Sequence, residues 1–288
     1  MPGPIVPPGK APDGRLLTSG RSGMAQRWFV TGVAGGLGQA LATALLDRGD
    51  IVVGTARRVA EAEAFARSRP GAAHGIALDL DDHARIAAAV EQAMALAGGG
   101  IDVVVNNAGR SLFAPVEETP LDDAKALFAT NLFGPMAVMQ AFLPHVRRQG
   151  RGTFVTISSG CGLMGVPGLG AYCASKFALE GLCETLAIEM AGFGGRMMLV
   201  EPGAVRTRFI SHGTAEVGAR GGHYGTLDGG KDLLDAYYQD KAMAPEAVAA
   251  AILAALDGGD PPPRLVLGDD TRPGARAKFQ ALADMLAD

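Results

Sequence analysis

A regular alternation of short apolar segments and longer helical patterns runs from Trp28 almost to the end of the chain and most constrains its fold. The interiors of the short segments are continuously apolar, which is typical of strands buried on both faces of a parallel sheet. Strands are predicted at 28–31, 51–56, 75–80, 101–106, 153–158, 196–201 and 264–267, and helices near 37–48, 59–68, 82–97, 120–149, 171–191 and 245–257. This order predicts an α/β fold, a doubly wound parallel seven-stranded sheet with helices on both faces.

The composition excludes several classes of protein. Of 288 residues, 48% are hydrophobic and 19% charged, which is enough apolar material for a large core and too little charge for a disordered chain. The net charge is −4 and Lys and Arg do not cluster, so we expect no nucleic-acid partner. Three cysteines without metal or redox spacing exclude a disulfide framework and fit a reducing, cytoplasmic compartment. Apolar runs break well before about 18 residues, so no membrane span is expected.

The domain organisation follows from where breakers and periodicity fall. Residues 1–24 are rich in Pro and Gly and are predicted to be a disordered leader, with a polyproline II docking tail as the alternative and Met24 as an alternative start. No linker divides 25–288, which predicts a single domain. Within it, residues 204–241 have weak periodicity and are predicted to be a loop over the binding site. Pro135 and Pro144 are expected to kink or split the long 120–149 helix.

A glycine-rich loop follows the first predicted strand and leads into a helix. It reads Thr31-Gly32-Val33-Ala34-Gly35-Gly36-Leu37-Gly38. Glycines let the backbone turn sharply and approach a pyrophosphate, and the start of the helix offers free N–H groups and a positive dipole end. The alternative is an ordinary tight turn. Because the loop lies between a strand and a helix, we expect a nucleotide, held by Gly32, Ala34, Gly36, Leu37 and Gly38.

A tyrosine and a lysine lie one helical turn apart in Tyr172-Cys173-Ala174-Ser175-Lys176. Residues four apart share one helix face. A free Tyr titrates near pH 10 and is a poor acid–base group at pH 7. An ammonium about 4 Å away favours the phenolate by roughly 4 kcal/mol, or about 3 pKa units before desolvation opposes it. The pair is therefore predicted to transfer protons, with a stray surface pair as the alternative.

Several motifs in order resemble the short-chain dehydrogenase/reductase family over about residues 27–268. The family pattern Thr-Gly-x-x-x-Gly-x-Gly is filled by Gly32, Gly36 and Gly38, and Asn106-Asn107-Ala108-Gly109 and Tyr172-x-x-x-Lys176 resemble two further motifs. Gly35 also permits the glycine spacing of the longer family branch. Ala34 stands where many relatives have Ser, so one contact to the cofactor is expected to be missing. The resemblance implies a Rossmann-like fold and an oxidoreductase that uses a nicotinamide cofactor.

The resemblance also implies the roles of the catalytic residues. Ser159, thirteen residues before Tyr172, matches the family's serine in spacing, with Ser158 as the competing candidate. Ser159 and Tyr172 would hydrogen-bond a substrate carbonyl oxygen, and Tyr172 would give or take the proton. Lys176 would lower the pKa of Tyr172 and bind the nicotinamide ribose. Asn131 would hold a water molecule that connects the lysine to solvent.

The end of the second strand bears on which dinucleotide binds. NAD-preferring relatives place an Asp there, whereas this chain has Ala56 followed by Arg57 and Arg58. Guanidinium groups pair well with a 2′-phosphate, so NADP(H) is predicted over NAD(H), with Arg57 as the main contact and Arg58 assisting. The alternative is a solvated pair of surface arginines. By resemblance, the adenine would lie against Asp79 and Leu80. Further contacts to the cofactor are expected from Asn107, Ala108, Gly109, Pro202, Gly203, Val205 and Thr207.

The substrate is the least constrained part of the prediction. Candidate pocket residues are mostly apolar and favour a hydrophobic ketone, aldehyde or alcohol, although packing would explain them equally well. They are Phe113, Leu163, Met164, Val166 and Phe209, with His212 and Tyr224 in the same loop. Helices 120–149 and 171–191 resemble those through which family members form dimers, so a homodimer or homotetramer is expected. A non-catalytic NADP(H) sensor or scaffold, or an epimerase or dehydratase of the longer branch, are the alternative functions.

Overall fold

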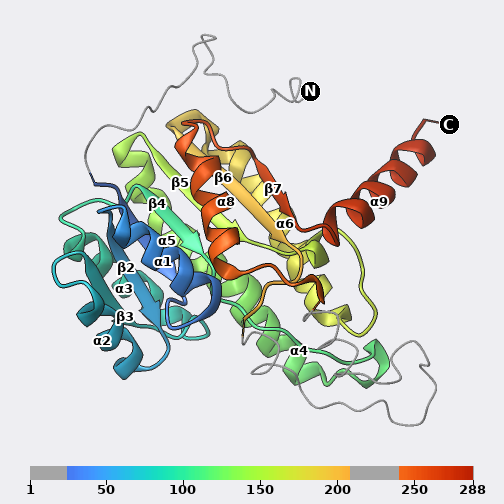
Figure 1. Ribbon diagram of the computed structural model, residues 1–288, viewed down its shortest axis with the longest axis horizontal. Coiled ribbons are helices and arrows are strands. Elements are labelled where there is room, and N and C mark those ends of the chain that lie inside the picture. Colours follow the sequence, from blue (N-terminus) through green and yellow to red (C-terminus); the bar gives the residue numbers. More distant parts are fainter. Residues whose placement is uncertain (1–24, 208–239, 288) are drawn as a thin grey trace.

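The computed structural model describes residues 25–207 and 240–287, and these form one seven-stranded parallel sheet (Figure 1). The strand order is β3-β2-β1-β4-β5-β6-β7. The strands are β1 Arg27–Thr31, β2 Ile51–Ala56, β3 Ala73–Ala77, β4 Val103–Asn106, β5 Gly152–Ile157, β6 Gly195–Pro202 and β7 Arg264–Leu267. The doubly wound α/β fold predicted from the alternating pattern is confirmed.

Helices cover both faces of the sheet, because successive strand residues point to opposite sides. They are α1 Gly36–Asp47, α2 Val59–Ser68, α3 His83–Leu96, α4 Leu121–Phe128, α5 Gly134–Gln149, α6 Gly170–Met190, α8 Pro245–Asp257 and α9 Thr271–Met285. Phe29 faces a core built with α3, α5 and α6. Its neighbours Trp28 and Val30 face a second core built with α1 and α8. Both faces of the sheet are therefore buried.

Several element bounds differ from the sequence prediction. β3 ends at Ala77, so the following residues leave the sheet instead of extending it to residue 80. The 120–149 helix is interrupted by a π-helical turn, η2 Ala129–Phe133. Pro135 lies in the first turn of α5, where its missing N–H costs nothing, while Pro144 lies inside α5 without ending it. The predicted 120–149 helix is therefore split just before Pro135, and Pro144 does not divide it.

Helix α9 was not predicted, because Pro273 and Gly274 near its start are typical breakers. In the structure, Asp270 caps the helix by accepting a hydrogen bond from the Thr271 N–H at 2.9 Å. Pro273 lies in the first turn, where proline is tolerated. α9 extends away from the sheet at the carboxyl-terminal end of the chain (Figure 1).

One helical stretch, Leu121–Gln149, is long and apolar enough to cross a membrane on length and composition alone, which differs from the sequence expectation. Several of its side chains, among them Val138, Met139 and Phe142, belong to the core against the sheet. Core helices of soluble proteins pass the same test, so the stretch carries no argument about a membrane.

Candidate active site

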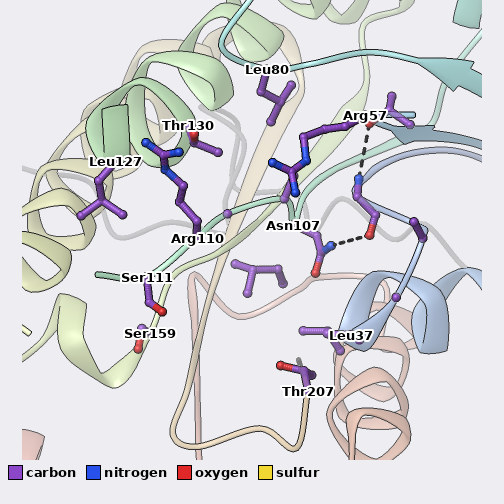
Figure 2. Close-up of a pocket in the computed structure, with 18 of the residues that line it drawn as sticks. Leu37, Arg57, Leu80, Asn107, Arg110, Ser111, Leu127, Thr130, Ser159 and Thr207 are labelled. Carbon is purple, nitrogen blue, oxygen red and sulfur yellow. Dashed lines mark hydrogen bonds between the residues drawn. The ribbon is translucent and has the colours of Figure 1, made fainter. Parts of the chain in front are cut away.

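A cavity of about 1020 Å³ runs along the carboxyl ends of the strands, where the strand order reverses between β1 and β4. Ligands of open parallel sheets bind at this position, since the loops on either side of the reversal diverge. The cavity wall comes from the glycine-rich loop, the end of β2, the loop after β4, the end of β5, α6 and the segment after β6. Figure 2 shows these segments converging on one crevice.

The glycine-rich loop lets the main chains of β1, β2 and the start of α1 approach one another closely. Gly32 has φ +77°, and its N–H donates to the Thr55 carbonyl at 3.0 Å. A Cβ atom on Gly38 would lie 2.1 Å from the Gly32 oxygen and 2.4 Å from Asn107 Nδ2, so only glycine lets α1 begin so close to the strand. Gly38 therefore sets the packing of the loop and is not itself in the cavity wall.

The first turn of α1 is available to an anion. Its N-cap, Gly35, has no side chain to cap the helix, and Gly35, Gly36 and Leu37 line the cavity. Uncapped N–H groups and the helix dipole together favour a phosphate at such a position. The loop thus fits the pyrophosphate of a dinucleotide.

Thr31 and Asn107 lock the ends of β1 and β4 together. Thr31 Oγ accepts hydrogen bonds from the N–H groups of Asn107 at 2.9 Å and Ala108 at 3.0 Å. Asn107 Nδ2 donates to the carbonyls of Thr31 at 2.8 Å and Gly32 at 3.2 Å (Figure 2). Asn107, Ala108 and Gly109 line the cavity as predicted, and Asn107 also fixes the shape of the glycine-rich loop.

The two arginines after β2 differ in their surroundings. Arg57 reaches over the crevice (Figure 2), and no described residue forms an ion pair with it. Arg58 is exposed and pairs with Glu61, which raises the pKa of Arg58 and lowers the pKa of Glu61. No carboxylate ends β2, whose last residue is Ala56. A negatively charged group at this end of the cavity would therefore meet Arg57 first.

Asp79 and Leu80 lie beyond the end of β3 and line the same end of the cavity. Leu80 is buried, while Asp79 is exposed and accepts a hydrogen bond from the Asp81 N–H at 3.1 Å. Both residues thus line the cavity as expected, while their adenine-binding role stays a prediction.

Tyr172 lies in the first turn of α6 and Lys176 in the second, and both are buried in the cavity wall. Lys176 Nζ donates to the carbonyl of Ile157, the last residue of β5, at 2.8 Å, and lies 5.8 Å from the centroid of the Tyr172 ring. Burial lowers the pKa of Lys176 to about 8, and the charge of Glu180 opposes this shift. The lysine is thus charged at neutral pH and faces the phenol.

Two serines, Ser158 and Ser159, directly follow β5, and both line the cavity. Ser159 is the N-cap of η3 Gly160–Gly162, and its Oγ accepts a hydrogen bond from the Cys161 N–H at 3.1 Å. Ser158 is buried, and its Oγ has no hydrogen-bond partner among the described residues. The less buried Ser159 is the better placed of the two to donate to a substrate oxygen.

Asn131 lies in the π-helical turn, fully buried. Its Oδ1 accepts from the Arg110 N–H at 2.9 Å, and its Nδ2 donates to the Arg110 carbonyl at 2.9 Å and to Ser175 Oγ at 3.1 Å. Ser175 Oγ in turn donates to the Tyr172 carbonyl at 2.8 Å. Asn131 therefore joins the loop after β4 to α6, while a water-holding role stays a prediction.

The segment after β6 closes the cavity on the side of the glycine-rich loop. Pro202, Gly203, Val205 and Thr207 all line it. A Cβ atom on Gly36 would lie 3.1 Å from Thr207 Cγ2, so these segments nearly touch. The position after Gly203 is also held from α9, because Asp270 accepts from the Ala204 N–H at 3.1 Å.

The predicted substrate residues do not lie together. Phe113 packs over Gly168, Val166 lies in the same apolar cluster, and neither is in the cavity wall. Leu163 and Met164 face α9: the Leu163 carbonyl accepts from Lys278, and Met164 lies beside Gly274. Phe209, His212 and Tyr224 lie outside the described residues. The substrate roles proposed for these side chains thus stay predictions.

Other wall residues were missed from the sequence because no motif marks them. They come from the loop after β4 and from α4 and η2: Arg110, Ser111, Leu112, Asp123, Leu127 and Thr130. Ser111 lies beside Ser159 in Figure 2. The first of them directly follow Gly109, at the edge where the strand order reverses, and this position could have identified them as wall residues from the sequence. Among the residues that the structure describes, no group of three or more His, Cys, Asp or Glu could hold a metal ion.

Comparisons with known proteins give the family. The family model for short chain dehydrogenase matches residues 26–216. The chain is 34% identical to "Oxidoreductase BOA17" of Botryotinia fuckeliana over 86% of this chain and 90% of the relative. It is 38% identical to "Estradiol 17-beta-dehydrogenase 1" of Rattus norvegicus over 73% of this chain, but spans only 62% of that relative.

Solved structures agree with this result. A short-chain dehydrogenase from Streptomyces avermitilis has a TM-score of 0.82 at 36% identity, covering 92% of this chain and 96% of that one. A short chain dehydrogenase from Burkholderia cenocepacia in complex with NADP has a TM-score of 0.71 at 26% identity, covering 92% and 98%. A relative from Burkholderia phymatum in complex with NAD shows the fold at 22% identity, with a TM-score of 0.75 and coverage of 89% and 92%. The chain is therefore a member of the short-chain dehydrogenase/reductase family of oxidoreductases.

Proposed function

We propose that the protein interconverts a carbonyl group and an alcohol on an apolar small molecule with NADP(H) as cofactor. The observation that carries the proposal is the meeting of Ser159, Tyr172 and Lys176 in one cavity with the uncapped start of α1. Membership of an oxidoreductase family whose relatives act on CH–OH or C=O groups supports the reaction class. When bound, the cofactor supplies or accepts a hydride.

The side chains of the protein handle the proton. Ser159 donates a hydrogen bond to the substrate oxygen, and Tyr172 gives its proton as negative charge develops there. In the direction of alcohol oxidation Tyr172 takes that proton back. Lys176 favours the phenolate by its charge, and the Ile157 carbonyl holds the lysine at 2.8 Å. A non-catalytic sensor or scaffold would have no use for this set of proton donors.

The preference for NADP(H) rests on Arg57. It is the cation at the adenosine end of the cavity that pairs with no described residue, and Ala56 leaves no carboxylate to repel a 2′-phosphate. The start of α1, Asn107 to Gly109 and the residues Pro202, Gly203, Val205 and Thr207 would hold the rest of the cofactor. Solved structures with this fold are complexes with NADP in one case and NAD in another, so support for NADP(H) comes from the arginine and not from the comparisons.

The apolar substrate rests on the wall near Ser159. Leu112 and Leu127 line that part of the cavity and continue into an apolar cluster behind it. The name of the rat relative, a dehydrogenase of estradiol, is consistent with a bulky apolar substrate.

A panel of carbonyl compounds and alcohols, read by NADPH absorbance, tests the reaction class. With a compound that turns over, Tyr172→Phe should abolish turnover and leave NADPH binding almost unchanged, because the ring remains and only the proton is lost. Turnover by Tyr172→Phe at the rate of the parent protein would remove Tyr172 as the acid. Retention of NAD by the purified protein would instead favour an epimerase or dehydratase.

Arg57→Ala tests the cofactor. It should weaken the binding of NADPH by roughly ten- to a hundredfold, as loss of a charge-assisted contact costs about 1.5–3 kcal/mol, and leave NADH binding nearly unchanged. Arg58→Ala is the matched control, since that arginine already pairs with Glu61 and should affect NADPH little. Equal losses for NADPH and NADH in Arg57→Ala would contradict the assignment.

A further inference from the structure

Asp270 and Thr271, at the start of α9, lie between two segments of the candidate active site. The carboxyl ends of β5, β6 and β7 lie side by side, because these parallel strands are neighbours in the sheet. The segment after β5 carries Ser159, and segment 202–207 at the end of β6 forms part of the cavity wall. Neither Asp270 nor Thr271 lines the cavity, so any effect of theirs on the reaction passes through these two segments.

Asp270 connects the start of α9 to segment 202–207. Its Oδ2 accepts a hydrogen bond from the Ala204 N–H at 3.1 Å, while its Oδ1 accepts one from the Thr271 N–H at 2.9 Å. The carboxylate also lies against Gly203, since a Cβ atom on this glycine would lie 2.0 Å from Oδ1. One side chain therefore caps the helix and fixes the main chain of the cavity wall.

Thr271 makes the corresponding contact with the turn that carries Ser159. Its side chain is buried, and a Cβ atom on Gly160 would lie 2.6 Å from Thr271 Oγ1 and 2.9 Å from Cγ2. Gly160 directly follows Ser159 and begins η3. Neither Gly160 nor Gly203 has a positive φ, so the backbone alone would accept other residues at both positions. The contacts with Asp270 and Thr271 are thus what require glycine there.

α9 is also held farther along its length. Lys278 Nζ donates a hydrogen bond to the Leu163 carbonyl at 2.8 Å and lies 4.3 Å from the centroid of the Phe177 ring. Leu163 belongs to the connection from Ser159 to α6, and Phe177 directly follows Lys176. The helix is therefore fixed, beyond its first residues, to the Ser159 segment and to α6.

We propose that Asp270 and Thr271 are positioning residues that together set the place of the cofactor relative to Ser159. Asp270 holds the wall that would contact the cofactor, and Thr271 holds the turn that carries the serine. The inference rests on the proposed function, in which cofactor and Ser159 meet at one substrate. Reacting atoms must lie about 3–3.5 Å apart, and a misplacement of about 1 Å can cost about a hundredfold in rate. A rigid link between the two segments meets this requirement.

Asp270→Ser tests the cofactor side and needs no turnover. Ser is as good an N-cap as Asp, so α9 should still form, but its shorter side chain cannot also reach the Ala204 N–H. We expect the dissociation constant for NADPH, followed by its fluorescence, to rise about tenfold, as for the loss of one hydrogen bond to a charged acceptor. The constant for NADH should rise by the same factor, because Thr207 of this segment and Arg57 lie well apart in the crevice (Figure 2).

The matched control for this change is Asp284→Ser, in the last turn of the same helix. Asp284 accepts a hydrogen bond from Gln280 at 2.8 Å and contacts no part of the cavity wall, so both dissociation constants should stay unchanged. Unchanged constants in Asp270→Ser, with or without a lower melting temperature, would show that Asp270 serves only the helix and would overturn its role.

Two complementary substitutions test the serine side. Gly160→Ala places a methyl group against Thr271 and should displace Ser159, so kcat should fall about a hundredfold while NADPH binding changes little. Thr271→Ala should lower kcat as well, because the contact with Gly160 is lost. The double variant should recover most of kcat, since the added methyl group fills the space that the threonine side chain leaves.

Each kcat is compared well below the melting temperature of the variant, so that it reports geometry and not unfolding. Gly165→Ala, in the same connection from β5 to α6, is the matched control, because a Cβ atom there would meet nothing within 4 Å. A kcat in Gly160→Ala equal to that of the parent protein, or a double variant no better than Gly160→Ala, would overturn the role of Thr271.

The outcomes separate this inference from the proposed function. If the parent protein turns over no carbonyl compound or alcohol, the proposed reaction fails, while the cofactor dissociation constants of Asp270→Ser still decide for or against the positioning role. If the parent protein turns over and both sets of variants behave like it, the proposed reaction stands and the positioning role of Asp270 and Thr271 is refuted.

Discussion

The charge of Lys176 should set the pH at which Tyr172 works. Its Nζ lies 5.8 Å from the centre of the phenol ring. At an effective dielectric constant near 20, a unit charge at that distance favours the phenolate by about 3 kcal/mol, which corresponds to about two pKa units. Replacing Lys176 by Met removes the charge and keeps an apolar stem of similar length in a buried position. The variant should therefore raise the pKa of Tyr172 by about two units.

The assay is the pH profile of kcat/KM for alcohol oxidation, in which Tyr172 must be deprotonated to accept a proton. The rising limb of that profile should move about two units to higher pH in Lys176→Met, and the rate at pH 7 should fall about a hundredfold. NADPH binding, followed by fluorescence, separates this effect from loss of the cofactor. A profile that keeps its midpoint while the rate falls would refute the electrostatic role and leave Lys176 as a ribose contact only.

Two further predictions test the packing and the buried charges. Gly38→Ala should lower the melting temperature by several degrees, corresponding to about 1–3 kcal/mol, and weaken NADPH binding, because the new Cβ would lie 2.1 Å from the Gly32 oxygen. Gly181→Ala is the control, since a Cβ at this position inside α6 would meet nothing within 4 Å, and it should not destabilise the protein. Glu201 is fully buried, and desolvation raises its pKa to about 7. The folded state therefore binds the proton of Glu201 more tightly than the unfolded state does, and the free energy of unfolding falls as the pH rises from about 4.5 to about 7. Glu201→Gln should flatten this dependence of stability on pH in thermal melts taken from about pH 4.5 to about pH 7.5. Glu184→Gln, which removes the more exposed partner of Arg264, should leave the dependence unchanged. The same pH dependence in Glu201→Gln as in the parent protein would contradict the raised pKa of Glu201.

The sequence predicts those parts of the fold that depend on the periodicity of apolar residues and on the spacing of motifs. Continuous apolar runs such as Val103–Val105 give buried strands, because a parallel sheet hides both faces. The positions of Tyr172 and Lys176 follow from helical periodicity, and that of the glycine-rich loop from its strand and helix. The resemblance to the family placed Ser159 correctly in the cavity, because one strand end and one helix start meet at the same edge of the sheet.

What depends on tertiary contacts was not predictable. Leu163 and Met164 follow Ser159 closely in the sequence, but α9 lies against them. The sequence did not predict α9, because Pro273 lies near its start. The sequence predicts Arg57 as the main contact and Arg58 as an assisting one, but the pairing of Arg58 with Glu61 is a tertiary contact that this prediction did not include.

The hydrogen bond between Lys176 and Ile157 has a consequence for how the protein tolerates change. Its acceptor is a main-chain carbonyl, which every amino acid possesses. Replacement of the Ile157 side chain therefore cannot delete this anchor, and mutational drift at that position is free to alter shape and volume alone. Inserting or deleting a residue within β5, or within α6 before Lys176, would instead change which carbonyl faces the ammonium, so the register of these two elements, rather than the side chain at position 157, is what selection has to preserve.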